Sequence, residues 1–402
     1  MQLKHLSLTN FRNFARLDAA IPDETTLILG RNAQGKTSIL EAIYYLATLS
    51  SFHAERDREL INFIEGRKPL AVGRIVAEYK KGGQDHQIEI RLIKEKTRNG
   101  IDRGRKEVLI DGVKKRNREA IGNFNAVLFL PQMMQIIEGS PGERRRFLDL
   151  LISQTSLSYT ENLSEYNKVI SQRNALLRQL NEKGGDSAQL AFWDERLSKR
   201  GAEIILKRIQ VIQELEQIAA RIHHELTRSN EVLRFAYDPA YDPVSTPENQ
   251  MSLMDAPTDR SMFALAQIET GFRERLESNR QEEIFRGQTS TGPHRDDMRF
   301  LANGISLGTF GSRGQVRTVM MTMKLAEVVW MKEKTGEYPV LLLDEVLAEL
   351  DEIRRSDLLK YVTNGQQALL TTTDLNLFDP KFTEGKKVWR IEDGVLGDNT
   401  ET

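Results

Sequence analysis

A phosphate-binding loop constrains the fold of this chain more than any other feature of its sequence. Residues 30–38, GRNAQGKTS, match the pattern G-x-x-x-x-G-K-[ST]. The run TTLIL before the loop predicts a strand, and the apolar spacing after it predicts a helix from about Lys36. Backbone N–H groups and a helix N-terminus must converge on phosphate oxygens, and this order provides both. A nucleoside triphosphate bound through its phosphates is expected, with a structural glycine turn as the alternative.

Two side chains at the end of this loop have distinct chemical roles. Lys36 supplies a cation for the β- and γ-phosphates, and the hydroxyl of Thr37 is a ligand for Mg²⁺. A nucleoside triphosphate and Mg²⁺ are therefore the expected ligands of the loop.

An acidic pair follows a second apolar run at residues 340–345, VLLLDE. Four consecutive aliphatic residues indicate a strand that is buried on both faces, as in a parallel sheet. Such a strand would deliver Asp344 to Mg²⁺, usually through water, and Glu345 to the attacking water as a general base. An acidic turn without chemistry is the alternative.

A serine and glycine segment precedes the helix expected from VRTVMMTMKLAEVVWM. Ser312 and the bare backbone of Gly314 could hold a γ-phosphate at this helix N-terminus. An ordinary N-cap explains the same residues, and taken alone the segment favours that explanation.

Composition excludes some classes of function. The chain of 402 residues has no cysteine, which excludes thiol catalysis and cysteine-based zinc sites. It has no apolar run of about 18 residues, so we expect a cytoplasmic protein without a membrane contact. The net charge is -1, yet residues 91–118 contain eleven Lys and Arg against four acids. A DNA-contacting surface and a solvated hairpin edge explain this segment equally well.

The rest of the chain divides by periodicity. Residues 70–130 show short strands with glycines between them, as in an antiparallel sheet. Residues 143–226 predict a helical hairpin interrupted at 181–189, and a loop is expected at about 237–261. Helix returns at 262–285, and short loops, one helix and two strands are expected from Gly287 onward.

Taken together, these motifs resemble those of the RecF family, bacterial ATPases with an ABC-type head related to the structural-maintenance-of-chromosomes ATPases. The resemblance rests on NFRNF at 10–14, EGSPGERRRFLD at 138–149, TGPHRDD at 291–297 and FGSRGQVRT at 310–318. It implies an α/β fold: an ABC-type phosphate-loop head with a mixed sheet, an appended antiparallel sheet and a short helical-hairpin arm. The implied domains are the head at 1–135 and 287–402 and the arm at 136–286.

The resemblance also implies a function. It points to a weak Mg-dependent ATPase of recombinational repair and replication restart, which helps to load recombinase at single-strand gaps and supports the SOS response. The implied partners are gapped DNA or single/double-strand junctions, RecR- and RecO-like mediator proteins, and a second copy in an ATP-dependent dimer. In that dimer Ser312 and Gly314 of one subunit would cap the nucleotide that Lys36 of the other holds.

Further site residues follow from the resemblance. Arg12 would contact nucleotide phosphate or ribose, Gln132 would help to ligate the metal, and Asp351 would reach across the dimer. His294 and Arg295 are left without a catalytic role, because a buried histidine or a structural ion pair explains them as well. The expected catalytic residues are Lys36, Asp344 and Glu345, the expected metal ligands are Thr37, Gln132 and Asp344, and the nucleotide-binding set is Arg12, Gly30, Arg31, Asn32, Ala33, Gln34, Gly35, Lys36, Thr37, Ser38, Gln132, Ser312, Arg313, Gly314, Gln315 and Asp351.

Two other ABC-type functions are weaker alternatives. A transporter ATPase usually has a switch histidine where this chain has Thr371, Thr372 and Thr373, and it needs a membrane partner. A chromosome-organising head needs a longer coiled coil than residues 143–226 can form, because bridging distant DNA segments requires reach.

Overall fold

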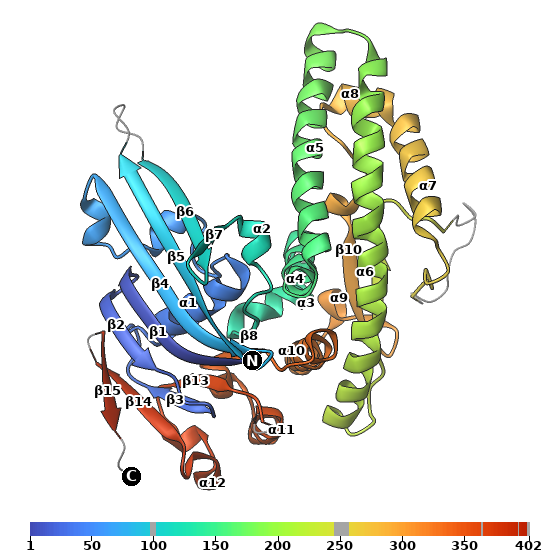
Figure 1. The fold of residues 1–402 in the computed structure, drawn as a ribbon. Helices are drawn as coiled ribbons and strands as arrows, with labels where there is room; N and C mark the ends of the chain where they lie inside the picture. Colours follow the sequence, from blue (N-terminus) through green and yellow to red (C-terminus); the bar gives the residue numbers. More distant parts are fainter. Residues whose placement is uncertain (97–101, 245–256, 363–364, 393, 400–402) are drawn as a thin grey trace. The chain divides into compact units, whose positions relative to one another are not determined.

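The computed structural model describes residues 1–96, 102–244, 257–362, 365–392 and 394–399. The chain divides into two compact units: Met1–Met133 with Glu327–Thr402, and Met134–Ala326 (Figure 1). The first boundary lies close to the expected one at residue 135. The second differs, because residues 287–326, which we expected in the head, pack into the unit that contains the arm. No helix among the described residues is both long and apolar enough to cross a membrane.

The first unit contains a mostly parallel sheet. Its strand order is β15-β14-β3-β13-β12-β8, and only the edge strand β15 runs antiparallel to its neighbour. The central strands β12 and β13 are buried along their whole length, which explains why VLLLD and ALLTT show no alternation. The strands are β3 (Thr26–Leu29), β8 (Ala126–Phe129), β12 (Val340–Asp344), β13 (Ala368–Thr372), β14 (Lys387–Glu392) and β15 (Val395–Asn399).

A second sheet in the same unit is antiparallel, as predicted for residues 70–130, although β8 of that range joins the parallel sheet instead and residues before position 21 add two strands. Its order is β2-β1-β4-β5-β6-β7. The strands are β1 (Gln2–Phe11), β2 (Phe14–Ala20), β4 (Leu70–Lys81), β5 (Gln84–Lys96), β6 (Asp102–Ile110) and β7 (Val113–Lys115).

Helix α1 (Lys36–Thr48) connects the two sheets. It contacts β8, β12 and β13 of the parallel sheet and also β4 of the antiparallel one. Its apolar residues, among them Ile39, Ile43 and Leu46, are buried in one core with both sheets. The helix that begins at the phosphate loop is therefore fixed on two sides. The other helices of this unit are α2 (Asn117–Ala120), α11 (Glu352–Val362) and α12 (Pro380–Thr383).

The second unit is built on the expected helical hairpin. Helices α5 (Leu157–Lys183) and α6 (Leu190–Leu226) run side by side in opposite directions, and α7 (Leu265–Ser278) lies along α6 (Figure 1). The side chain of Ser156 caps α5 by accepting a hydrogen bond from the Tyr159 N–H. The remaining helices are α3 (Gln135–Glu138), α4 (Pro141–Ser153), α8 (Arg280–Arg286) and α9 (Leu307–Phe310), and α10 (Arg313–Thr335) runs across the boundary between the units.

A small sheet in the second unit was not expected. Strand β10 (Asp297–Ala302) pairs antiparallel with β9 (Leu233–Asp238) and with β11 (Ile305–Ser306). The expectation of one helix and two strands after Gly287 was therefore wrong, because neither β10 nor β11 has a continuous apolar run like the one that marks β12 as a strand in the sequence. Strand β9 also takes the first two residues of the expected loop at 237–261, of which residues 245–256 lie outside the described part of the chain.

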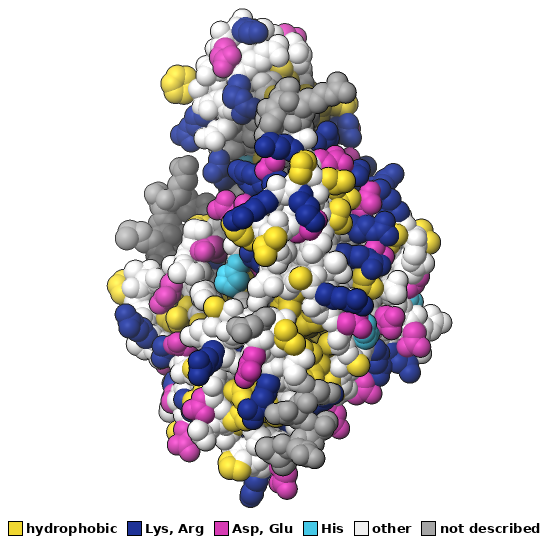
Figure 2. Space-filling model, turned by 90° about the vertical axis from the view of Figure 1, so that its left-hand side faces the viewer, with side chains coloured by type: hydrophobic (Ala, Val, Ile, Leu, Met, Phe, Trp, Pro, Cys, Tyr) yellow, Lys and Arg dark blue, Asp and Glu magenta, His cyan; other side chains and the backbone are white. Residues whose placement is uncertain are grey.

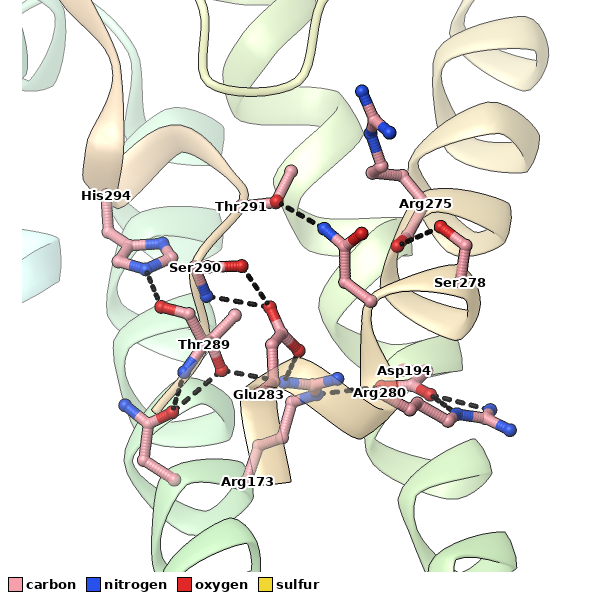
Figure 3. A network of polar contacts seen from close by, with 12 residues as sticks. Arg173, Asp194, Arg275, Ser278, Arg280, Glu283, Thr289, Ser290, Thr291 and His294 are labelled. Carbon is pink, nitrogen blue, oxygen red and sulfur yellow. Dashed lines mark hydrogen bonds and ion pairs between the residues drawn. The ribbon is translucent and has the colours of Figure 1, made fainter. Parts of the chain in front are cut away.

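The arm is held by a buried ion network (Figure 3). Arg173 on α5 donates to Asp194 Oδ1 on α6 at 2.7 Å and to Glu283 Oε2 on α8 at 2.6 Å, and all three side chains are fully buried. Arg280 donates to the second oxygen of Asp194, and Ser290 donates to the second oxygen of Glu283. One arginine thus joins three helices.

The TGPHRDD segment forms a second such network. Arg208 on α6 donates to Asp296 Oδ2 at 2.8 Å and to the carbonyl oxygen of Pro293 at 2.6 Å. Arg144 on α4 forms a bidentate pair with Asp297, at 2.6 and 2.9 Å. This segment therefore ties α4 and α6 together, and these arginine contacts hold residues 293–297 in the second unit.

Candidate nucleotide-binding site

A cavity of about 760 Å³ opens beside the phosphate loop in the first unit. Ligands of open α/β sheets bind beyond the carboxyl ends of the strands, and Asp344, the last residue of β12, lines this cavity. Its lining combines the predicted residues Arg12, Asn32, Ala33, Gln34, Gly35, Lys36, Thr37, Ser38, Gln132, Asp344 and Glu345 with the unpredicted Asn13, His53, Glu59, Ile61, Asn62, Phe63, Ile64 and Pro131.

The loop takes its shape from a glycine and a neighbouring turn. Gly35 has φ 112°, and a Cβ there would lie 2.5 Å from Asn13 Nδ2 and 2.8 Å from Phe14 Cζ. Asn13 also donates to the carbonyl oxygen of Gln34 at 3.1 Å. The turn between β1 and β2 therefore presses directly against the loop, and only glycine fits at position 35.

Lys36 is held inside the loop. Its ammonium donates to the carbonyl oxygens of Gly30 at 2.7 Å and Arg31 at 3.0 Å, and it lies 3.0 Å from Glu345 Oε1. An ammonium has three donors, and the two carbonyl oxygens use two of them, so the third remains for the carboxylate or for an anion. The Lys36 side chain is 4% exposed, whereas that of Glu345 is 39% exposed. The carboxylate is therefore the partner of Lys36 that an incoming anion can replace most easily.

Two oxygen ligands lie side by side next to Lys36. The Thr37 hydroxyl lies 2.9 and 3.1 Å from the two carboxylate oxygens of Asp344. Asp344 pairs in register with Thr371 of β13, and the Thr371 hydroxyl donates to Asp344 Oδ1 at 2.7 Å. A threonine hydroxyl and a carboxylate suit Mg²⁺, which takes oxygen ligands from a few side chains and from phosphates. This pair fits the expected metal.

Glu345 follows the strand at a bend. Its backbone has φ 52°, which is uncommon for a residue other than glycine, and its N–H donates to the Thr371 hydroxyl at 3.0 Å. Thr371 therefore holds both Asp344 and Glu345. The Thr371 hydroxyl, which stands in the segment where a transporter ATPase usually has its switch histidine, is thus bonded to these two acidic residues.

Gly30 and Arg31 belong to a neighbouring cavity. This cavity of about 460 Å³ shares Gln34 with the first and is also lined by Thr373 and Arg390. The residues of the predicted phosphate loop therefore line two adjoining cavities of the same unit.

Arg12 lines the larger cavity, and a carboxylate fixes its side chain. Its guanidinium donates to both oxygens of Glu41 on α1, at 2.6 and 2.8 Å. Gln132 lies in the single turn that follows β8 and is exposed. Both residues lie where the sequence placed them, although the contact with a nucleotide stays a prediction.

The serine and glycine segment belongs to the second unit. The Ser312 N–H donates to Gln315 Oε1 at 3.0 Å, and the Gln315 N–H donates to Ser312 Oγ at 3.2 Å. These reciprocal bonds form a capping box at the start of α10. The ordinary N-cap is therefore present, while Arg313 and Gly314 follow it as the first residues of the helix.

Asp351 also acts as an N-cap. It accepts a hydrogen bond from the Arg354 N–H at 2.9 Å at the start of α11, and this bond holds the pKa of Asp351 below its usual range. A role across a dimer stays a prediction for this residue.

The basic segment is largely matched by acids. Lys94 pairs with Asp102 at 3.0 Å, and Lys114 pairs with Glu107 at 2.8 Å. Lys106 lies 3.2 Å from Asp57. Residues 97–101 of this segment lie outside the described residues. On the face drawn in Figure 2, Lys and Arg side chains are likewise interspersed with Asp and Glu. These pairs favour the solvated hairpin edge, and a DNA contact here stays open.

His294 and its neighbours have structural partners. His294 Nδ1 lies 2.8 Å from the Tyr166 hydroxyl, and Nε2 lies 3.2 Å from the carbonyl oxygen of Thr289. Burial lowers the pKa of His294 from 6.5 to about 4. Arg295 contacts Gln288 at 3.3 Å. These contacts favour a structural histidine, whose side chain is partly buried.

Comparison with known proteins decides the family. The model for the RecF/RecN/SMC N terminal domain matches residues 2–393. The DNA replication and repair protein RecF of Chloroflexus aurantiacus is 38% identical over 98% of this chain and 99% of its own length. The RecF protein of Ligilactobacillus salivarius is 37% identical over 98% of this chain and 97% of its own length. The chain belongs to the RecF family of DNA replication and repair proteins.

Solved structures agree with this assignment. The recombination mediator protein RecF with ATP, from the RecFOR pathway, has a TM-score of 0.83 at 30% identity and covers 99% of this chain and 98% of its own. A Smc head domain from Pyrococcus furiosus has a TM-score of 0.50 at 15% identity, over 98% of this chain and 95% of its own, and shows a shared fold alone. The predicted ABC-type head with an antiparallel sheet and a helical arm is confirmed for this RecF family member.

Proposed function

We propose that this chain is a weak Mg-dependent ATPase that binds DNA and works in recombinational repair and replication restart in the cytoplasm. One observation carries the proposal: Lys36, Thr37, Asp344 and Glu345 meet at one cavity with the phosphate loop. A cation, two oxygen ligands and a carboxylate are the groups that phosphoryl transfer to water requires.

Each residue has a proposed task. Lys36 and the backbone of the loop bind the β- and γ-phosphates, and Thr37 and Asp344 hold Mg²⁺, with Gln132 as a further ligand. Mg²⁺, when bound, neutralises phosphate charge. A phosphate that takes the Lys36 ammonium releases the Glu345 carboxylate, which lies 3.0 Å from it. Glu345 is then free to orient the attacking water and accept its proton.

A second copy of the chain would complete the site. We propose that Ser312 and Gly314 of one subunit cap the nucleotide held by Lys36 of its partner, with Asp351 reaching across the same dimer. The capping box at Ser312 is compatible with this role, because it uses the side chain locally and leaves N–H groups of the first helical turn to bind an anion.

The family assignment supports the choice of partners. The RecF protein whose structure with ATP is similar to this chain is a recombination mediator of the RecFOR pathway. We therefore propose gapped DNA or single/double-strand junctions as the DNA partner, RecR- and RecO-like proteins as mediators, and roles in recombinase loading and the SOS response.

Substitution of the proposed base tests hydrolysis. Glu345→Gln should lower Mg-dependent release of phosphate from ATP by about 100- to 10,000-fold, because an amide cannot accept the proton from water. Binding of ATP, followed by calorimetry, should persist. Glu349→Gln changes an exposed acid nearby and should hydrolyse at the wild-type rate. An unchanged rate in Glu345→Gln would remove Glu345 from this role.

A further inference from the structure

A buried carboxylate lies behind the nucleotide cavity. Glu41 is on helix α1, one turn beyond Thr37, and its side chain is 2% exposed. It accepts two hydrogen bonds from Arg12 and one from the Ser51 hydroxyl at 2.5 Å. A carboxylate in an apolar core is costly unless it is paired and hydrogen-bonded, so its presence requires an explanation.

The hydrogen-bond donors of Arg12 suggest an explanation for the buried Glu41. A guanidinium has five N–H groups in one plane. Two bond Glu41, and one bonds the carbonyl oxygen of Glu59 at 3.3 Å. These contacts leave two N–H groups, on Nη1 and Nη2, and Arg12 lines the cavity with a side chain that is 24% exposed. Because the pair with Glu41 is bidentate, it fixes the plane in which the remaining donors lie.

The backbone of Arg12 is fixed as well. Its φ of 51° is uncommon for arginine. Its N–H donates to the carbonyl oxygen of Leu60 at 2.8 Å, and its own carbonyl oxygen accepts from Asn62 Nδ2 at 2.7 Å. Hydrogen bonds thus hold both the main chain and the side chain of Arg12 in this strained conformation. Such residues are typical of functional sites.

Ser51 connects Glu41 to another segment that lines the cavity. Its hydroxyl oxygen accepts hydrogen bonds from the N–H groups of His53 at 2.9 Å and Ala54 at 2.7 Å, while it donates to Glu41. His53 lines the cavity. Glu41 thus connects α1, the Arg12 turn and the segment that contains His53.

We propose that Glu41 is a positioning residue for nucleotide binding: it orients the Arg12 guanidinium so that two N–H groups meet an anionic group of the nucleotide. This inference rests on the proposed function of the cavity. Glu41 itself touches no nucleotide and acts through Arg12.

Calorimetry with Mg·ATP and Mg·ADP on four proteins tests this: wild type, Glu41→Gln, Arg12→Gln and the double variant. Glu41→Gln should weaken ATP binding by about 10- to 100-fold, the range for hydrogen bonds that involve a charged group. The double variant should bind no more weakly than Arg12→Gln alone, because Glu41 has no route to the nucleotide except Arg12. The difference between ATP and ADP shows which phosphate Arg12 meets.

Glu89→Gln is the matched control. Glu89 is also a largely buried carboxylate of the first unit, bonded by Arg74 at 2.7 Å and Arg91 at 2.6 Å, and these bonds help to lower its pKa to about 2. It does not line the cavity. Glu89→Gln should reduce thermal stability, as Glu41→Gln should, but it should leave ATP affinity at the wild-type value. A merely structural Glu41 would behave like this control.

The outcomes separate the two proposals. If wild type binds ATP and folded Glu41→Gln binds it equally well, the positioning role of Glu41 is overturned and the proposed function stands. If wild type binds no ATP, both are overturned. If Glu41→Gln fails to fold, Ser51→Ala takes its place, with an expected loss of about 2- to 10-fold in ATP affinity and wild-type affinity as the contradicting result.

Discussion

Both units of the chain bury charged side chains, but they satisfy them differently. In the arm, all four carboxylate oxygens of Asp194 and Glu283 accept hydrogen bonds from Arg173, Arg280 and Ser290, and the central residues are fully buried. In the head, Lys36 is buried but one of its three partners is the half-exposed Glu345. The arm network is closed to ligands, whereas the head keeps a partner that an anion can replace.

This comparison distinguishes buried charged residues that stabilise the fold from a buried charged residue that can bind a ligand. A buried pair from which one member is removed leaves an uncompensated charge, which is strongly destabilising. A cation at the edge of a cavity loses much less, because its carboxylate partner can turn to solvent. Stability and nucleotide binding should therefore respond oppositely to substitutions in the two regions.

The largest effect on stability is expected for Arg173→Met. This substitution removes the cation that Asp194 and Glu283 share and leaves their buried negative charges uncompensated. It should lower the free energy of unfolding by about 3–5 kcal/mol. Arg286→Met, on the same unit, breaks an exposed pair with Glu282 and should cost less than about 1 kcal/mol. Urea denaturation followed by circular dichroism measures both. Equal losses would show that the arm network is no more than a surface arrangement.

A pH-dependent effect is expected for His294. Because its pKa is about 4 in the folded chain and 6.5 is its ordinary value, the unfolded chain binds more protons between these pH values. Stability should therefore be complete above pH 6.5 and fall by about 3 kcal/mol as the pH decreases to 4. In His294→Gln this part of the pH dependence should disappear. A variant with the wild-type slope between pH 7 and pH 4 would place the titration elsewhere.

The smallest effect on stability is expected for Lys36→Met. Methionine can fill the space of the lysine stem. Glu345 and the carbonyl groups of Gly30 and Arg31, which line an open cavity, can all be hydrated, so the free energy of unfolding should change by less than about 1 kcal/mol. ATP affinity should nevertheless fall by about 100-fold or more, because a charged hydrogen bond to phosphate is lost. If destabilisation matches that of Arg173→Met, the contrast between the two regions fails.

The sequence predicted the parts of the site that are local in the chain. The phosphate loop, the strand before Asp344 and the helical hairpin each depend on neighbouring residues, and the structure has all three. The partners of these residues were not predictable, because they come from distant segments: Arg12 meets Glu41 across 29 positions, and Arg173 meets Glu283 across 110. Thr371 was also missed as a support for Asp344, since only the register of β12 with β13 brings them together.

Sedimentation velocity with Mg·ATP tests the composite nucleotide site most directly. Wild type should sediment as a monomer without ATP and as a dimer with it, and gapped DNA should increase the dimer fraction. Ser312→Arg should still bind ATP by calorimetry yet remain a monomer, because arginine would block the surface that caps the partner's nucleotide. Circular dichroism should show that its fold is intact, since loss of the cap costs only about 1 kcal/mol. ATP-dependent dimers of folded Ser312→Arg, at the wild-type fraction, would contradict the proposal that a second copy completes the site.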